Sequence, residues 1–214
     1  MSVAVIPIKS LAHSKSRLSS DFDRSELERL SLSMLEDLLG ALLATPALTR
    51  VAVATPDERV AELARSLGAE ALHGPDPGLK SAIDDAPQKL GLEADEALLV
   101  VLGDLPDAHP DELQRLFESI QDSEGPVAAL APSSDGGTSA LLRRPHDCIP
   151  SCFGPESARR HTEAAESQGV PILRIPLPSL DLDLDSVTDL DRFWSNNGRG
   201  LRTRETLSRM GWPR

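Results

Sequence analysis

The chain has 214 residues, a length that fits one domain, and 40% of them are hydrophobic, too many for a disordered chain. Its 22 lysines and arginines against 34 aspartates and glutamates give a formal net charge of −12, and only 3% of the residues are aromatic. A nucleic-acid partner is therefore not expected, because this charge repels a polyanion and few rings are present on which bases could stack.

Cysteine usage and apolar runs indicate the compartment. Cys148 and Cys152 are too few for a disulfide framework, and they fit a reducing environment. The longest unbroken apolar run, Ala97 to Leu102, is far shorter than the roughly 20 residues that span a bilayer. Pro7 and Lys9 come too early for a signal peptide. We expect a cytoplasmic protein without a membrane partner, and leave open whether it forms a homodimer.

The first half of the chain alternates short apolar runs with helical patterns. The apolar, β-branched runs predict strands over 3–8, 51–54, 69–72 and 97–102. A capping box from Ser25 to Glu28 predicts the start of a helix that continues to Leu42. Further helices are predicted after Thr55-Pro56 as far as Gly68, over 79–90 and over 110–120.

The second half begins with a change of pattern. Two apolar runs, 127–131 and 139–143, flank a Ser-Ser-Asp-Gly-Gly turn and predict a hairpin. A helix over 155–167, a strand over 171–175 and a helix over 186–195 follow. The basic stretch 196–214 is expected to be a solvated tail, with a cap on the nucleotide or on a dimer interface as alternatives. The order predicts one α/β domain over 1–214, a three-layer α/β/α sandwich whose Rossmann-like, mostly parallel sheet has one antiparallel interruption.

Acidic residues follow the strands at the edge where such sheets bind ligands. Asp104, in Gly103-Asp104-Leu105-Pro106, comes directly after the central strand, where a carboxylate can hold Mg²⁺ or simply form a turn. Asp181, Asp183 and Asp185 alternate along an extended segment. They suit a metal, a solvated edge or a helix N-cap, but not an EF-hand, because Ser186 and Arg192 replace the required Gly and Glu.

Cations follow the first strand. Lys9, Lys15 and Arg17 lie on one loop, and the first twenty residues contain no acid. Cations spaced in this way can bind a triphosphate and neutralise a leaving pyrophosphate. The alternative is a solvated basic loop, since charged loop residues are usually exposed. Because the familiar GxxxxGK[ST] and GxGxxG loops are absent, this loop is the better candidate for a phosphate-binding element.

A second phosphate site is expected at the helix predicted over 155–167. Pro155 suits its first position, so that the free N–H groups and the Ser157 hydroxyl could bind an anion, with Arg160 one turn further on. An ordinary helix start explains the same residues. His161 is expected to be a surface histidine rather than an acid or base. The turn Asp135-Gly136-Gly137 brings two hydroxyls, Thr138 and Ser139, to the same edge.

Taken in order, several short motifs resemble a known family. They are Ile6-Pro7-Ile8-Lys9, Lys15-Ser16-Arg17-Leu18, Gly78-Leu79, Gly103-Asp104-Leu105-Pro106, Gly137-Thr138, Phe153-Gly154 with Ser157, and Asp183-Leu184-Asp185. The sequence is similar to the 2-phospho-L-lactate guanylyltransferases of coenzyme F-420 biosynthesis, whose relatives use phosphoenolpyruvate or 3-phosphoglycerate. It departs from the family pattern at Lys80 and Ser139, where asparagine is usual.

The resemblance implies a fold like that of nucleotide-diphospho-sugar transferases and a reaction that joins GMP from GTP to a small phosphorylated acid, releasing pyrophosphate. Mg²⁺ would be held by Asp104 and Asp185, with Asp183 as an alternative ligand. The implied catalytic and nucleotide-binding residues are Lys9, Lys15, Arg17, Asp104, Gly78, Lys80 and Gly103. The acceptor would contact Thr138, Ser139, Gly154, Ser157 and Arg160. Two alternatives stay open: a nucleotidyltransferase using CTP or UTP with a phosphosugar or polyol phosphate, and a non-catalytic nucleotide-binding regulator.

Overall fold

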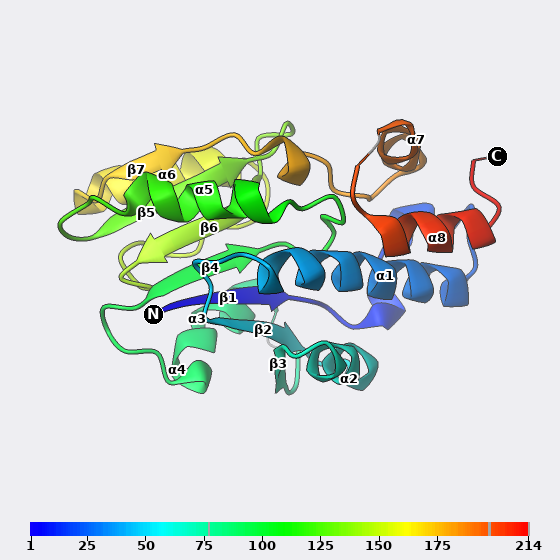
Figure 1. The fold of residues 1–214 in the computed structure, drawn as a ribbon, viewed down its shortest axis with the longest axis horizontal. Coiled ribbons are helices and arrows are strands. Elements are labelled where there is room, and N and C mark those ends of the chain that lie inside the picture. Colours follow the sequence, from blue (N-terminus) through cyan, green and yellow to red (C-terminus); the bar gives the residue numbers. More distant parts are fainter. Residues whose placement is uncertain (77, 197, 214) are drawn as a thin grey trace.

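A computed structural model describes residues 1–76, 78–196 and 198–213. Across these residues a seven-stranded sheet has the order β3-β2-β1-β4-β6-β5-β7 (Figure 1). Its strands are β1 (Ser2–Pro7), β2 (Arg50–Thr55), β3 (Glu70–His73), β4 (Ala97–Val101), β5 (Val127–Pro132), β6 (Thr138–Arg144) and β7 (Ile172–Arg174). The apolar runs of the sequence predicted all seven strands to within a few residues.

The sheet is parallel except at β6. This strand pairs antiparallel with both β4 and β5, while β7 returns parallel to β5. The predicted hairpin and the single antiparallel interruption are thus confirmed. In the pairing of β1 with β4, Val5 lies opposite Val100. The segments that leave these two strands therefore emerge next to each other, and they carry Lys9 and Asp104.

Helices cover both faces of the sheet, as expected for a three-layer sandwich. One face packs against α1 (Arg24–Leu43), α2 (Glu58–Ser66) and α5 (Pro110–Ile120). The other face packs against α3 (Leu79–Asp84), α4 (Ala86–Leu90) and α6 (Ser157–Gln168). The short helices η1 (Leu11–His13), η2 (Ser16–Leu18) and η3 (Pro178–Leu180) lie in connections. Among the described residues, no helix combines the length and apolar character needed to cross a membrane.

The first helix begins two residues earlier than the predicted capping box. Asp23 is the N-cap: its carboxylate accepts from the N–H of Glu26 at 2.9 Å, and Glu26 accepts from the N–H of Asp23 at 2.9 Å. This register places Phe22 and Leu27, the residues before the cap and four after it, in one buried cluster. Such a hydrophobic staple selects the Asp23 cap over the equally plausible pattern at Ser25.

Two other helices differ from prediction. The helix predicted over 79–90 is interrupted at Asp85, giving α3 and α4, because Pro87 suits the start of a helix and not its interior. Helix α6 begins at Ser157, and Glu156 before it has a left-handed backbone with φ of 54°. Pro155 therefore lies in the preceding turn and not at the first helical position.

The prediction of a solvated C-terminal tail is wrong. Residues Leu201–Arg209 form α8, which lies beside α1 (Figure 1). Its Leu207 is fully buried, and Trp212 beyond it is 5% exposed. Together with α7 (Val187–Ser195), α8 covers the end of α1 and builds a separate apolar cluster. The many arginines of the segment obscured this amphipathic pattern in the sequence.

Candidate functional site

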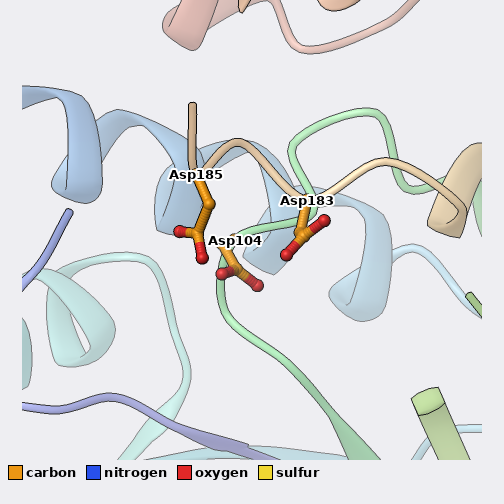
Figure 2. Close-up of side chains that lie close together, drawn as sticks. All are labelled: Asp104, Asp183 and Asp185. Atoms are coloured by element: carbon orange, nitrogen blue, oxygen red, sulfur yellow. The ribbon is translucent and has the colours of Figure 1, made fainter. Parts of the chain in front are cut away.

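Four charged side chains meet where β1 and β4 end. Lys15 places its Nζ 3.0 Å from Asp104 Oδ2 and 2.8 Å from Asp185 Oδ1. One carboxylate oxygen from each of Asp104, Asp183 and Asp185 lies within 4.8 Å of the other two. Figure 2 shows these three side chains together. The structure thus brings together residues separated by up to 170 positions in the sequence, as the strand-end argument predicted.

Lys15 reaches this cluster from an unusual backbone conformation. It lies between η1 and η2 with φ of 52° and ψ of 39°, in the left-handed region, and its side chain is only 6% exposed. Burial alone would lower the pKa of Lys15, but the charges of Asp104 and Asp185 outweigh this effect and raise it. The ammonium group is therefore held charged between the two carboxylates.

The segment that carries the other two carboxylates is fixed by the residue between them. The side chain of Leu184 is fully buried, and its N–H donates to the carbonyl of Asp104 at 3.3 Å. Asp183 and Asp185, on either side, consequently turn towards Asp104. Asp181 is not part of this group and follows η3. Ser186, and not Asp185, is the N-cap of α7, so the carboxylate of Asp185 is left for the cluster.

The two aspartates of this segment differ in proton affinity. Burial, followed by repulsion from Asp104 and Asp185, raises the pKa of Asp183 to about 6. Burial also opposes ionisation of Asp185, but attraction to Lys15 outweighs it, and the pKa of Asp185 is lowered. The three carboxylates therefore carry more negative charge than the single positive charge of Lys15 balances.

These residues fit a divalent cation. Three carboxylates, each with an oxygen within 4.8 Å of the others, form an all-oxygen donor set, which Mg²⁺ prefers. Burial, and then repulsion from Asp104 and Asp185, raises the pKa of Asp183, and a cation at this point would offset the repulsion. Lys15 provides positive charge in the same place. A cation would share Asp104 and Asp185 with that ammonium group, and Asp183 adds a third donor.

A cavity of about 460 Å³ opens beside the cluster. Its lining includes seven of the predicted site residues: Lys9, Lys15, Arg17, Gly78, Gly103, Asp104 and Asp185. Gly103 lies so close to the residue that follows β1 that an added Cβ would be 2.0 Å from Ile8 Cδ1. Its lack of a side chain therefore lets the Asp104 loop approach the Lys9 loop. Lys80 is 70% exposed, pairs with Asp84 along α3 and is not among the lining residues.

The residues expected to bind the acceptor gather around a buried histidine. His161 is fully buried on α6, and its Nε2 accepts from the N–H of Cys152 at 2.8 Å. The ring proton is therefore on Nδ1, which donates to Thr138 Oγ1 at 3.1 Å. Burial, and then the charges of Arg143 and Arg160, lower the pKa of His161 to about 4. The prediction of a surface histidine is wrong.

The remaining predicted acceptor residues lie on β6 (Ser139), in the turn before α6 (Gly154) and in the first turn of α6 (Ser157 and Arg160). The side chains of Ser139 and Ser157 are buried, whereas Gly154 is exposed with φ of 112°. Arg160 donates to the carbonyl of Phe153 at 3.0 Å and so joins α6 to the turn that precedes it. Ser139 also accepts through its carbonyl from the N–H of Leu102 at 3.1 Å, which joins this group to the Asp104 loop.

Two residues that position the cationic loop were not identified from the sequence. Asp57 accepts from the N–H of Leu11 at 3.0 Å, and Arg24 donates to the carbonyl of Ser14 at 2.9 Å. Asp57 caps the start of α2, and Arg24 is the first residue of α1. In the sequence these positions indicated helix starts and not contacts with the cationic loop. Their role follows from contacts across 46 and 10 residues, which no local pattern encodes.

Two solved structures share this architecture. A putative nucleotide-diphospho-sugar transferase from Desulfovibrio desulfuricans superposes with a TM-score of 0.73 at 18% identity, covering 98% of this chain and 96% of the other. A nucleotidyl transferase from Methanothermobacter superposes with a TM-score of 0.67 at 18% identity, covering 96% and 99%. At these identities the likeness concerns the fold, which is as predicted.

Sequence relatives add the class of activity. The chain is 38% identical over 202 residues to a phosphoenolpyruvate guanylyltransferase of Rubrobacter xylanophilus, covering 94% of this chain and 97% of that protein. It is 34% identical over 212 residues to a 3-phospho-D-glycerate guanylyltransferase of Phenylobacterium zucineum, covering 97% and 96%. The fold, the acidic cluster and these relatives define the chain as a nucleotidyltransferase. More particularly, it belongs to the family described as guanylyl transferase CofC like, whose model matches residues 2–213.

Proposed function

We propose that this protein transfers the guanylyl group of GTP to a small phosphorylated three-carbon acid and releases pyrophosphate. The acceptors in view are phosphoenolpyruvate, 3-phospho-D-glycerate and 2-phospho-L-lactate, and the product would enter coenzyme F-420 biosynthesis. The names of the relatives support GTP as donor and the first two acids as acceptors.

The observation that carries the proposal is the meeting of cations and carboxylates beside one cavity. Lys15, Asp104 and Asp185 line it together with the exposed Lys9 and Arg17. A nucleoside triphosphate needs such a mixture, because its phosphates require cations and the metal that accompanies them requires carboxylates. The volume of about 460 Å³ suits a ligand of nucleotide size.

The chemistry requires positioning more than proton transfer. A phosphate oxygen of the acceptor attacks the α-phosphorus of GTP, forming the new O–P bond, while the bond from that phosphorus to the bridging oxygen breaks and pyrophosphate leaves. The attacking phosphate is already ionised near neutral pH, so this chain needs no general base. Mg²⁺, when bound by Asp104, Asp183 and Asp185, would neutralise charge on the phosphates. Lys9, Lys15 and Arg17 would hold the β- and γ-phosphates in line with the acceptor.

The acceptor would lie towards the group around His161. Gly154 and the turn before α6 face solvent there. The N–H groups of Ser157 and Ala158 already donate to the carbonyls of Gly154 and Gly136 at 3.1 and 3.3 Å, so a phosphate would bind at the start of α6 by displacing one of these carbonyls. The buried Thr138 hydroxyl and the neutral His161 would fix this turn from within. Ser139 follows Thr138 on β6 and accepts from the N–H of Leu102, so it would set the distance between acceptor and donor.

Pyrophosphate release with GTP and Mg²⁺, in separate reactions with the three acceptors, tests the proposal. We expect release with at least one acid, and the acid that gives it names the reaction. A parallel series with CTP and UTP examines the alternative donors. A CMP:2-keto-3-deoxy-manno-octonic acid synthetase solved with CTP has a related fold, with a TM-score of 0.64 at 15% identity. Turnover with those nucleotides but not GTP would overturn the proposal.

The variant Asp104→Asn, measured in the same pyrophosphate assay, tests the role of the Asp104 carboxylate. The substitution keeps the size of the side chain but removes a charge that both Lys15 and a cation would use. We expect turnover to fall by a factor of about 100 or more, with an unchanged circular dichroism spectrum. Asp181→Asn is the matched control, because Asp181 is on the same acidic segment but outside the cluster. Near-normal turnover of the Asp104 variant would refute the assigned role of this carboxylate.

A further inference from the structure

The C-terminal segment from Gly198 to Trp212 packs against the loops that carry Lys15, Asp104 and Asp185. Helix α8 lies along α1, and Asp37 on α1 accepts from the N–H and hydroxyl of Thr203 at 2.8 and 2.7 Å. The same segment is hydrogen-bonded to the Asp104 loop. It shares an apolar cluster with the loops that carry Lys15 and Asp185.

The Asp104 loop is joined to the segment through Asp107. This carboxylate accepts from the N–H of Gly200 at 3.1 Å and lies 3.9 Å from the guanidinium of Arg204. The approach is close: a Cβ added to Gly200 would be 2.6 Å from the ring of Phe193 and 3.3 Å from Pro106. The start of α8 therefore fits tightly against the loop only a few residues after Asp104.

The other two loops are joined through apolar side chains. Leu184, between Asp183 and Asp185, and Leu18, three residues after Lys15, are both fully buried. They belong to the same cluster as Leu207 and Trp212 of the C-terminal segment. The ring of Trp212 also lies 6.0 Å, centroid to centroid, from that of Phe22.

Arg204 is the residue at which these connections meet. Its guanidinium donates to the carbonyls of Phe193 and Trp194 at 2.7 and 3.2 Å and lies 4.3 Å from the centroid of the Phe193 ring. It thereby ties the end of α7, which follows the Asp183–Asp185 segment, to Asp107 of the Asp104 loop. The side chain is 19% exposed and is not among the residues that line the cavity.

We propose that Arg204 is a positioning residue that sets the separation of Asp104 from Asp183 and Asp185, and with it the affinity of the site for its divalent cation. The inference rests on the proposed function only for its activity readout. Removing the guanidinium takes away the link from α7 to Asp107, while the hydrogen bond from Leu184 to the Asp104 carbonyl remains, so the three carboxylates still meet but their separation is less tightly fixed. Small displacements of this kind have large kinetic effects because the reaction depends on alignment.

The test compares Arg204→Met with Arg202→Met. Methionine keeps most of the apolar stem. The side chain of Arg202, on the same helix, is 60% exposed and pairs with Glu36 and Glu205. Binding of Mn²⁺ alone is followed by electron paramagnetic resonance, and the Mg²⁺ concentration for half-maximal turnover is measured in parallel. Arg204→Lys provides a milder variant that keeps the charge near Asp107.

We expect Arg204→Met to bind Mn²⁺ about threefold to tenfold more weakly, to need correspondingly more Mg²⁺ and to lose roughly tenfold in kcat. Arg204→Lys should fall between it and the wild type, and Arg202→Met should match the wild type. Partial unfolding would reduce kcat without changing the Mg²⁺ requirement. Unchanged metal affinity in folded Arg204→Met and Arg204→Lys would overturn the inference. Absence of turnover in the wild type would overturn the proposed function instead, while the Mn²⁺ titration still decides the role of Arg204.

Discussion

At the scale of single residues, the site is built around a strained and buried lysine. A left-handed backbone costs a non-glycine residue about 1 kcal/mol, and burying an ammonium group costs more unless it is paired. Lys15 bears both costs and is compensated by Asp104 and Asp185. When phosphates enter, Lys15 would exchange carboxylates for phosphate oxygens, and the carboxylates would become available to a cation.

His161 leads to a prediction about stability and pH. Its pKa is lowered to about 4 by burial and then by Arg143 and Arg160, whereas an unfolded histidine titrates near 6.5. Between these values the unfolded chain binds more protons than the folded one. The stability associated with His161 is therefore complete above about pH 6.5 and lost as the pH falls towards 4. At about pH 5 the loss should be roughly 2 kcal/mol.

Urea unfolding of the wild type and of His161→Gln at several pH values measures this contribution. We expect the variant to be less stable near neutral pH, since glutamine does not fill the site, but to lose less stability on acidification. His13→Gln, which changes an exposed histidine, is the control for general effects. Parallel pH profiles for wild type and His161→Gln would contradict a neutral buried histidine.

At the scale of elements, the cap of α1 gives a prediction that separates two similar sequence patterns. Asp23→Ala removes the acceptor for the N–H of Glu26 and should lower the melting temperature by about 2–4 °C. Ser25→Ala should have less effect, because the Ser25 hydroxyl only donates to Asp23 at 2.9 Å. Thermal unfolding followed by circular dichroism compares the two. A larger loss for Ser25→Ala would favour the cap predicted from the sequence.

The elements also show what the sequence could predict. The central strands β1 and β4 were recognisable because buried parallel strands consist of continuous apolar residues, and their ends located Lys15 and Asp104. Helix α8 was missed because its arginines suggested solvent, while the contacts that fold it, to Asp37 and Asp107, come from distant segments. The burial of His161 likewise depends on Thr138 and Cys152, on other elements.

At the scale of the whole molecule, charge is divided unevenly. The chain has a net charge of −12, whereas Lys9, Lys15 and Arg17 lie in an N-terminal segment of twenty residues without an acid. Lys9 and Arg17 are exposed where the cavity opens. A small polyanion is thus attracted locally by an otherwise repelling molecule, which favours a nucleotide over a nucleic acid.

The uneven distribution of charge predicts how the Kd for GTP depends on salt concentration. Exposed charges are screened as the Debye length shortens, so the Kd for GTP with Mg²⁺ should increase severalfold between about 50 and about 300 mM KCl. Arg17→Gln should weaken binding at low salt and flatten this dependence, since Arg17 is 77% exposed and its ion pair with Asp185 is 3.8 Å long. Arg209→Gln, on the exposed face of α8 and 75% exposed, is the control that removes equal charge elsewhere. Titration calorimetry gives the slopes: equal slopes for both variants would mean that net charge, and not the cationic loop, governs the attraction of GTP.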